Sequence, residues 1–145
     1  MNNPIWRIDW NDGMSVGIPE IDEDEKYFLH LVDEFNQSIV DRMDISEVRK
    51  RLQDIVDDSE RHFSNEERLL NGRRYPKLGD HTLKHVELKN LIRHILTDSA
   101  CYTVDTEWIK AGLNIKEALL NHILTADMKY AEYYRSRIAG VTGKS

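Results

Sequence analysis

The chain has 145 residues, enough for one domain with a buried core. Its formal net charge of −6 argues against nucleic-acid binding, which needs Lys and Arg clustered on one face. No apolar run approaches the roughly 20 residues of a membrane span, and the N-terminus lacks the basic start and apolar stretch of a signal peptide. Cys101 is the single cysteine and has no partner for an intramolecular disulfide, so we expect a cytoplasmic protein.

The first two expected helices follow an N-terminal arm over residues 1–19. Apolar residues at three- and four-residue steps predict a helix from near Glu20 to about Arg42, with a stripe of Phe28, Leu31, Val32, Phe35 and Ile39. Ser46 suits the start of the second helix, and Asn71-Gly72 and Tyr75-Pro76 end it. One face of this helix carries Val48, Leu52, Ile55, Ser59, His62, Glu66 and Leu69.

Two further helices complete the pattern. Asp80 is placed to cap a third helix that carries His81, His85, Leu88, Ile92 and Ile95, and Asp105 or Thr106 is placed to cap the fourth. The fourth carries Trp108, Ala111, Ile115, Ala118, Leu119, His122 and Ala126, followed by tyrosines. The sequence therefore predicts an all-α, up-down-up-down four-helix bundle over residues 20–139, with a frayed tail over residues 140–145.

Polar groups interrupt the apolar stripes on every helix. His62 and Glu66 are spaced i, i+4, and so are His81 and His85, which places each pair on one face. The stripes also include Glu25 on the first helix and His122 on the fourth. A single buried histidine is usually a hydrogen-bonded core residue, and a single His–Glu pair commonly lies on the surface.

Six such groups from four helices are different: burying them is costly unless they are paired, hydrogen-bonded or bound to a metal, and a purely structural core gains nothing from them, so we predict a metal site. Imidazole and carboxylate without thiolate suit iron, manganese or zinc, and Cys101 lies outside the set. His30 and His94 fall off the stripes and are expected to face solvent. Asp127 follows His122 by five residues, which turns it about 140° away on a regular helix. Only a π-helical turn would align the two, so spacing alone leaves the role of Asp127 open.

These motifs resemble the bacterial branch of the hemerythrin family from Trp10 to about Tyr134. The arm reads Val16-Gly17-Ile18 and Ile21-Asp22, like the family's VGI..ID. Then follow His62-Phe63-x-x-Glu66-Glu67, like HFxxEE, and Tyr75-Pro76 with His81-x3-His85, like YP….HxxxH. The last helix reads Asn121-His122-Ile123-x3-Asp127, similar to NHIxxxD.

The resemblance implies a cofactor of two non-haem iron ions with a bridging oxo or hydroxo group, and dioxygen as the ligand. It implies that His81, His85 and His122 hold one iron, and that His62 and the residue at position 25 hold the other. Glu66 and Asp127 would bridge the two metals.

Two positions depart from the family pattern. Glu25 stands where the family's first helix has a histidine, and as a ligand it would lower the formal charge of the metal pair by one and favour the ferric state. The alternative is that Glu25 is not a ligand but hydrogen-bonds a metal-bound water, which would leave the second metal weakly held. Ala118 stands where the family usually has a tryptophan. The loss of that indole would open the oxygen pocket unless a residue such as Trp108 refills it. Both departures favour a protein that reacts with oxygen readily and holds it poorly.

Three functions stay open at this point. The leading hypothesis is an oxygen or redox sensor, either free or joined to a signalling domain or partner. The second is a di-iron enzyme with oxidase or peroxidase chemistry. The third is metal storage or a structural metal bundle.

Overall fold

The computed structural model describes residues 6–142, and for residues 139–142 only the helical backbone. Four rods of helix form the molecule: α1 (Pro19–Val40), α2 (Ile45–Gly72), α3 (Leu78–Asp98) and a last rod of α4 (Asp105–His122), the π-helical turn η3 (Ile123–Asp127) and α5 (Met128–Thr142). Single 3-10 turns lie at Asp12–Met14 (η1) and Ser99–Cys101 (η2).

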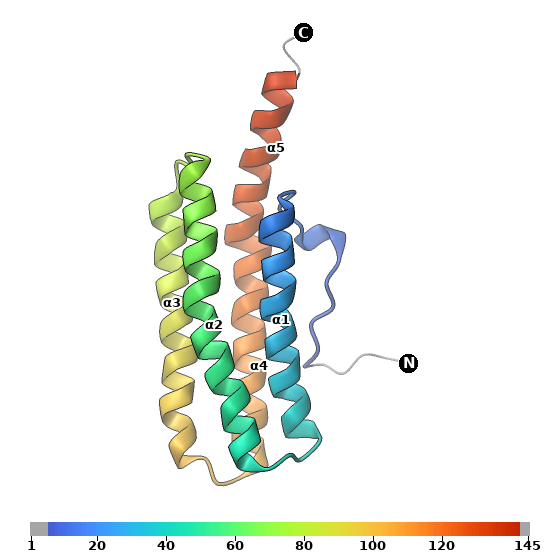
Figure 1. The fold of residues 1–145 in the computed structure, drawn as a ribbon, viewed down its shortest axis with the longest axis vertical. Helices are drawn as coiled ribbons and strands as arrows, with labels where there is room; N and C mark the ends of the chain where they lie inside the picture. The colour runs from blue at the N-terminus through green and yellow to red at the C-terminus, as the bar shows by residue number, and fades with distance from the viewer. Residues whose placement is uncertain (1–5, 143–145) are drawn as a thin grey trace.

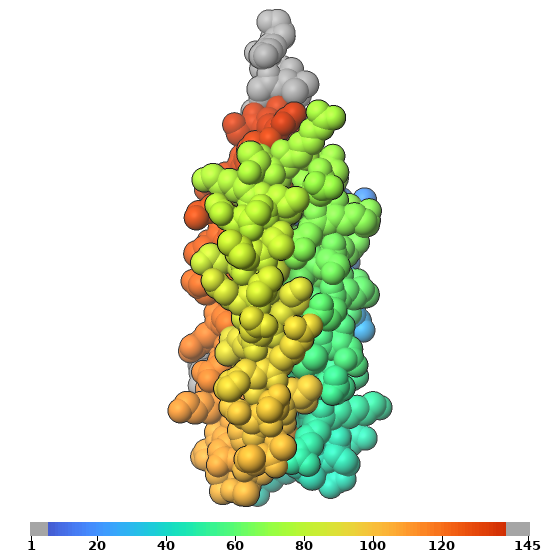
Figure 2. Space-filling view, turned by 90° about the vertical axis from the view of Figure 1, so that its left-hand side faces the viewer, coloured from blue at the N-terminus to red at the C-terminus, as the bar shows by residue number. Residues whose placement is uncertain are grey.

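The helices run alternately up and down, and α5 extends past the turn between α2 and α3 (Figure 1). α1 contacts α2 and α4, and α3 contacts the same two helices, which closes the ring of a four-helix bundle. Figure 2 shows α3 lying along one face of the molecule, flanked by α2 and α4. The predicted all-α bundle is confirmed, and no described helix is long and apolar enough to span a bilayer.

Periodicity identified the inward face well. Every residue of the expected stripe on the second helix is buried, from Val48 to Leu69, and so are the five expected on the third. Leu31 and Ala118 are only partly buried, because each lies at the edge of its stripe.

The helix starts differ from the sequence-based expectation. Asp80 lies inside the first turn of α3 rather than at its N-cap, and Asp105 is the first residue of α4, after Val104 at the N-cap. Neither start has a side-chain hydrogen bond from its N-cap residue. At the start of α4, Glu107 instead accepts a hydrogen bond from the Thr103 backbone N–H at 2.9 Å. Acidic side chains in a first turn still interact favourably with the positive end of the helix dipole. Asp80 and Asp105 therefore mark the correct helix ends, but their assignment as N-caps was wrong.

Two helix ends share one backbone device. Arg42 after α1 and Arg74 after α2 adopt the left-handed conformation, with φ of 53° and 56°. The next residues, Met43 and Tyr75, donate backbone hydrogen bonds to Ser38 and Leu70. This is the Schellman pattern, in which glycine is the usual residue at the left-handed position.

The arm is fastened to the bundle by two carboxylates of α1. Asp22 accepts hydrogen bonds from the Ser15 hydroxyl at 2.5 Å and from the Val16 backbone N–H at 2.9 Å. Asp33 accepts one from the Ile8 backbone N–H at 3.0 Å. At the other end of the chain, the helical backbone continues through residue 142 where a frayed tail was expected, and residues 143–145 lie outside the described part.

The core consists of two apolar clusters with polar residues between them. On α1, Ile21 belongs to one cluster and Phe28 to the other, and Glu25 lies between. On α2, Glu66 lies in the same way between Phe63 and Leu69. The bundle therefore buries a polar layer across its section, flanked by apolar packing.

Candidate metal centre

The polar layer contains every residue that the sequence singled out as a metal ligand. All are at most 6 % exposed, although an unpaired buried charge is expensive. They are Glu25 from α1, His62 and Glu66 from α2, His81 and His85 from α3, His122 from α4 and Asp127 from η3. Outside this layer His30 and His94 are exposed, as predicted, and each lies near a carboxylate on its own helix.

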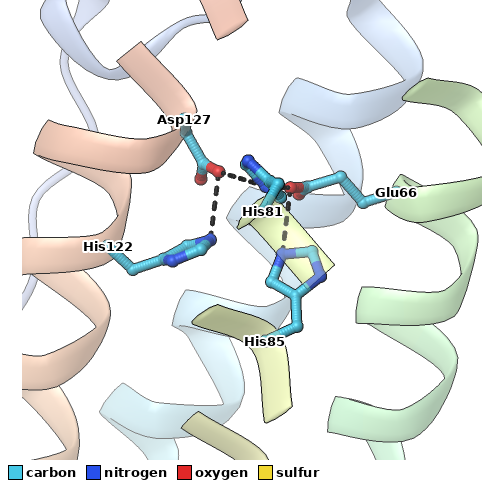
Figure 3. A group of neighbouring side chains, drawn as sticks. All are labelled: Glu66, His81, His85, His122 and Asp127. Atoms are coloured by element: carbon cyan, nitrogen blue, oxygen red, sulfur yellow. Dashed lines mark hydrogen bonds and ion pairs between the residues drawn. The ribbon is translucent and has the colours of Figure 1, made fainter. Parts of the chain in front are cut away.

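Five of these side chains converge on one point (Figure 3). His81 Nε2 lies 2.7 Å from Glu66 Oε1 and 3.2 Å from Asp127 Oδ1. His85 Nε2 approaches the same Glu66 oxygen at 3.2 Å, and His122 Nε2 lies 3.1 Å from Asp127 Oδ1. Each of the five offers one ligand atom within 4.8 Å of the others, which is close enough for a single ion to touch all of them.

The π-helical turn explains how Asp127 joins this group. Between Ile123 and Asp127 the backbone is π-helical, so the chain turns less per residue than in an α-helix. Asp127 therefore returns to the face of His122 in spite of the five-residue spacing. The π-helical turn that is needed to align Asp127 with His122 is therefore present in the structure.

A second donor group lies beside the first and shares one residue with it. His62 Nε2 lies 3.0 Å from Glu25 Oε2, and these two residues form a further cluster with Glu66. Glu66 is the residue common to both groups, whereas Asp127 belongs to the first group alone. The site is thus a two-centre donor set joined by one carboxylate.

Two outer carboxylates, which sequence reasoning did not assign, orient the histidines. Asp24 Oδ2 lies 2.9 Å from His62 Nδ1, and Arg61 holds its other oxygen at 2.7 Å. Glu67 Oε2 lies 2.6 Å from His85 Nδ1. A carboxylate on Nδ1 leaves Nε2 free for a metal and fixes the ring. The signal in the sequence that could have found them is their position, since Asp24 directly precedes Glu25 and Glu67 directly follows Glu66.

Some of the inner atoms are close to neighbours without being hydrogen-bonded. His85 Nε2, His122 Nε2 and Asp127 Oδ1 are buried and lack a hydrogen-bond partner among the described residues, although each is within 3.2 Å of an opposite group. Their approach is short but misdirected for hydrogen bonding. Atoms aimed at a shared point rather than at one another fit a metal between them.

Without a metal ion, Glu25 and His81 in the layer hold their protons more strongly than the free side chains do. Burial raises the pKa of Glu25 to about 7, against the opposing effect of the neighbouring His62. Burial lowers the His81 pKa, but Asp127 and Glu66 outweigh it and raise that pKa to about 10. For Glu66, burial is outweighed by the histidines, so its pKa lies well below the usual value. A cation entering the layer would therefore displace protons.

Two phenylalanine rings pack against the histidines on one side of the layer. Phe28 stacks on the His62 ring with centroids 4.7 Å apart, and Phe63 stacks on His85 at 4.4 Å. These phenyl rings fix the imidazoles and exclude water from one side of the layer.

Ala118 lies at an opening toward the layer. A cavity of about 280 Å³ is lined by Ala118 and His122 on the last rod and by Leu88 and Leu91 on α3. Trp108 does not refill it: the indole packs against Phe35 and Tyr102, and ten residues of helix separate it from Ala118 by about 15 Å. The suggestion that Trp108 takes the place of the missing tryptophan is wrong, because the two positions lie at different heights of the bundle.

A helical bundle with a buried donor layer contributed by all four rods defines a class of cation-binding helical proteins. The chain belongs to the hemerythrin family: the model of the hemerythrin HHE cation binding domain matches residues 16–134. The chain is similar to a bacteriohemerythrin of Stenotrophomonas maltophilia (strain R551-3), with 25 % identity over 132 residues, 89 % of this chain and 82 % of that protein.

Proposed function

We propose that this hemerythrin-family chain holds two non-haem iron ions and responds to dioxygen as a sensor or redox-reactive protein rather than as a carrier. The observation that supports two ions is the pair of donor groups joined by Glu66. Similarity to a bacteriohemerythrin supports the same reading. The cytoplasmic location and a joined or partner signalling domain, both expected from the sequence, belong to this proposal.

The proposed ligand assignment follows the two groups. One iron would be held by His81, His85 and His122, and the other by His62 and Glu25. Glu66 would contribute to both ions, and Asp127 would do so as the family resemblance implies. Nitrogen and oxygen donors without thiolate suit iron, and Cys101 is exposed in η2, outside the layer. When bound, a ferrous pair supplies two electrons to dioxygen.

Glu25 is the residue that favours response over carriage. It is 5 % exposed and in contact with His62, so a metal ligated by His62 meets a carboxylate where the family offers an imidazole. An anionic oxygen donor stabilises the more highly charged ferric state. Asp24 adds a second carboxylate on the far side of His62, which makes that imidazole a stronger donor.

Replacing Glu25 by histidine tests the proposal. Wild type and Glu25→His are loaded with iron without oxygen, then exposed to air while near-ultraviolet charge-transfer absorption is followed. We expect about two irons per chain in both, rapid decay of the oxygenated spectrum in wild type, and a long-lived spectrum in Glu25→His.

Glu23→His is the matched control, because Glu23 is on the same helix but exposed. It should behave as wild type. Equal lifetimes in wild type and Glu25→His would refute the role of Glu25, and a protein that stays colourless and binds zinc tightly would favour the structural metal bundle.

A peroxidase-like enzyme is the second candidate, and the cavity beside Ala118 favours it. The cavity gives small molecules an approach to His122, which a closed carrier would not need. Steady turnover of hydrogen peroxide by the iron-loaded chain, lost in Glu25→Ala, would support the enzyme over the sensor.

A further inference from the structure

A cavity rich in arginine and tyrosine lies outside the metal layer, where α5 passes the end of α2. Its volume is about 500 Å³, within the usual range of small-molecule sites. Arg73 and Arg74 line it from the end of α2, and Tyr133, Tyr134 and Arg137 line it from α5. Figure 1 shows α5 extending beyond the neighbouring turn at this end of the bundle.

The arginines of this cavity lack the carboxylate partners that several other arginines near α2 have. Arg51, Arg61 and Arg93 form ion pairs with carboxylates of the bundle. Arg73, Arg74 and Arg137 have no carboxylate partner among the described residues, and no carboxylate is among the described residues that line the cavity. Among the described residues, three guanidinium groups without a carboxylate partner thus surround one hollow and give it a local positive charge, on a chain with a net charge of −6.

The tyrosine rings are held in place before any ligand arrives. The Arg137 guanidinium donates a hydrogen bond to the Tyr133 hydroxyl at 2.8 Å, and the Tyr133 ring rests against Tyr75 with centroids 5.3 Å apart. Tyr134 stacks on Tyr130 at 6.1 Å, and the Arg73 guanidinium lies 5.8 Å from the Tyr134 ring centre. Rings fixed in advance lose less entropy when a ligand binds.

The chemistry of these groups selects a planar aromatic ligand that carries a phosphate. Arginine matches phosphate through paired hydrogen bonds, and a nucleobase stacks on tyrosine rings. Arg73 and Arg137 lie 5.8 and 5.7 Å from the ring centres of Tyr134 and Tyr133, so stacking of the base requires these guanidinium groups to turn from the rings toward the phosphate. The helix start is not involved, since Arg73 and Arg74 follow the C-terminus of α2, whose carbonyl groups repel anions. The arginine side chains must therefore supply the attraction.

We propose that this cavity is a binding site for an aromatic mononucleotide. The site is independent of the metal assignment, because none of its residues belongs to the two donor groups. Its test therefore succeeds or fails whatever the metal layer holds.

Calorimetric titration of the purified full chain with flavin mononucleotide and with adenosine monophosphate tests the proposal. Riboflavin and adenosine present the ring without phosphate, and inorganic phosphate presents the anion without a ring. We expect at least one mononucleotide to bind, and its nucleoside and inorganic phosphate each to bind about tenfold or more weakly. Failure of both mononucleotides, or equal binding of nucleoside and nucleotide, would overturn the proposal.

The two left-handed arginines supply a matched pair of variants. Arg74→Gly and Arg42→Gly relieve the same backbone conformation, but only Arg74 lines the cavity. We expect Arg74→Gly to weaken nucleotide binding about tenfold and Arg42→Gly to leave it unchanged. Arg137→Gln should give a similar loss to Arg74→Gly, whereas equal effects of Arg74→Gly and Arg42→Gly would place binding elsewhere.

Discussion

His122 and Asp127 are five residues apart in the chain, yet His122 Nε2 lies 3.1 Å from Asp127 Oδ1. The π-helical turn between them makes this contact possible, because a regular helix would point the two side chains about 140° apart. One extra residue in a turn thus converts a solvent-facing spacing into a shared site.

Replacing Asp127 by asparagine should weaken metal binding at the first donor group. Asparagine keeps the shape but removes the charge that faces His81 and His122, so we expect at least about a tenfold loss of affinity. Competition with a chromophoric chelator measures it. Asp80→Asn, on the exposed start of α3, should leave affinity unchanged, and an unaffected Asp127→Asn protein would remove Asp127 from the ligand set.

Asp24→Asn should weaken metal binding at the His62 end by about 10- to 100-fold, because His62 Nδ1 loses its carboxylate partner. Asp58→Asn is the control, since Asp58 binds the same Arg61 at 2.8 Å without touching His62. Iron stoichiometry under limiting metal distinguishes the two. Equal losses in both variants would show that Arg61 placement, rather than the carboxylate on His62, matters.

Ala118→Trp should fill the cavity of about 280 Å³ beside His122 and slow oxidation of the iron-loaded protein several-fold. An indole at this position replaces water and small molecules next to the imidazole. Stopped-flow absorption after mixing with oxygen measures the rate. Ala100→Trp, in η2 at the opposite end of α3, should not change it. Identical rates for Ala118→Trp and wild type would mean that oxygen enters elsewhere.

Gly112 permits the close approach of α4 to α1. A methyl group there would overlap the buried Asn36 side-chain oxygen, so Gly112→Ala should destabilise the fold by about 1–3 kcal/mol. Gly79→Ala meets nothing within 4 Å and should stabilise by about 0.5–1 kcal/mol through helix propensity. Urea unfolding midpoints compare them, and adding Asn36→Ala to Gly112→Ala should recover much of the loss if overlap is the cause.

Tyr130 predicts an alkaline loss of stability. Burial raises its pKa to about 12, above the ordinary 10.0, so the unfolded chain releases the phenol proton first. The stabilising contribution is complete below pH 10 and disappears as the pH rises toward 12, by roughly 2–3 kcal/mol.

Tyr130→Phe should lack this component, and because the buried hydroxyl has no hydrogen-bond partner among the described residues, the substitution should cost little or stabilise slightly at neutral pH. Tyr27→Phe, half exposed, is the control. Parallel alkaline unfolding curves for wild type and Tyr130→Phe would contradict the assignment.

Local helix geometry made much of the site readable in the sequence. A period of 3.6 residues fixes which side chains share a face, so His62 with Glu66 and His81 with His85 were assigned to the buried side without knowledge of their neighbours. Helix starts are harder to predict, as Asp80 shows. A cap depends on the backbone conformation of a single residue and not on a repeated sequence pattern.

The sequence by itself determined the four amphipathic rods and the type of donor that each one buries, because these depend on backbone periodicity alone. Only the tertiary structure decided that Asp24 reaches from α1 to His62, and that Trp108 lies too far along the bundle to cover Ala118. The place of Glu66 in both donor groups was implied by the family resemblance and not by periodicity. Distances between helices depend on how the rods cross and which rotamers fit between them, and no local pattern encodes those.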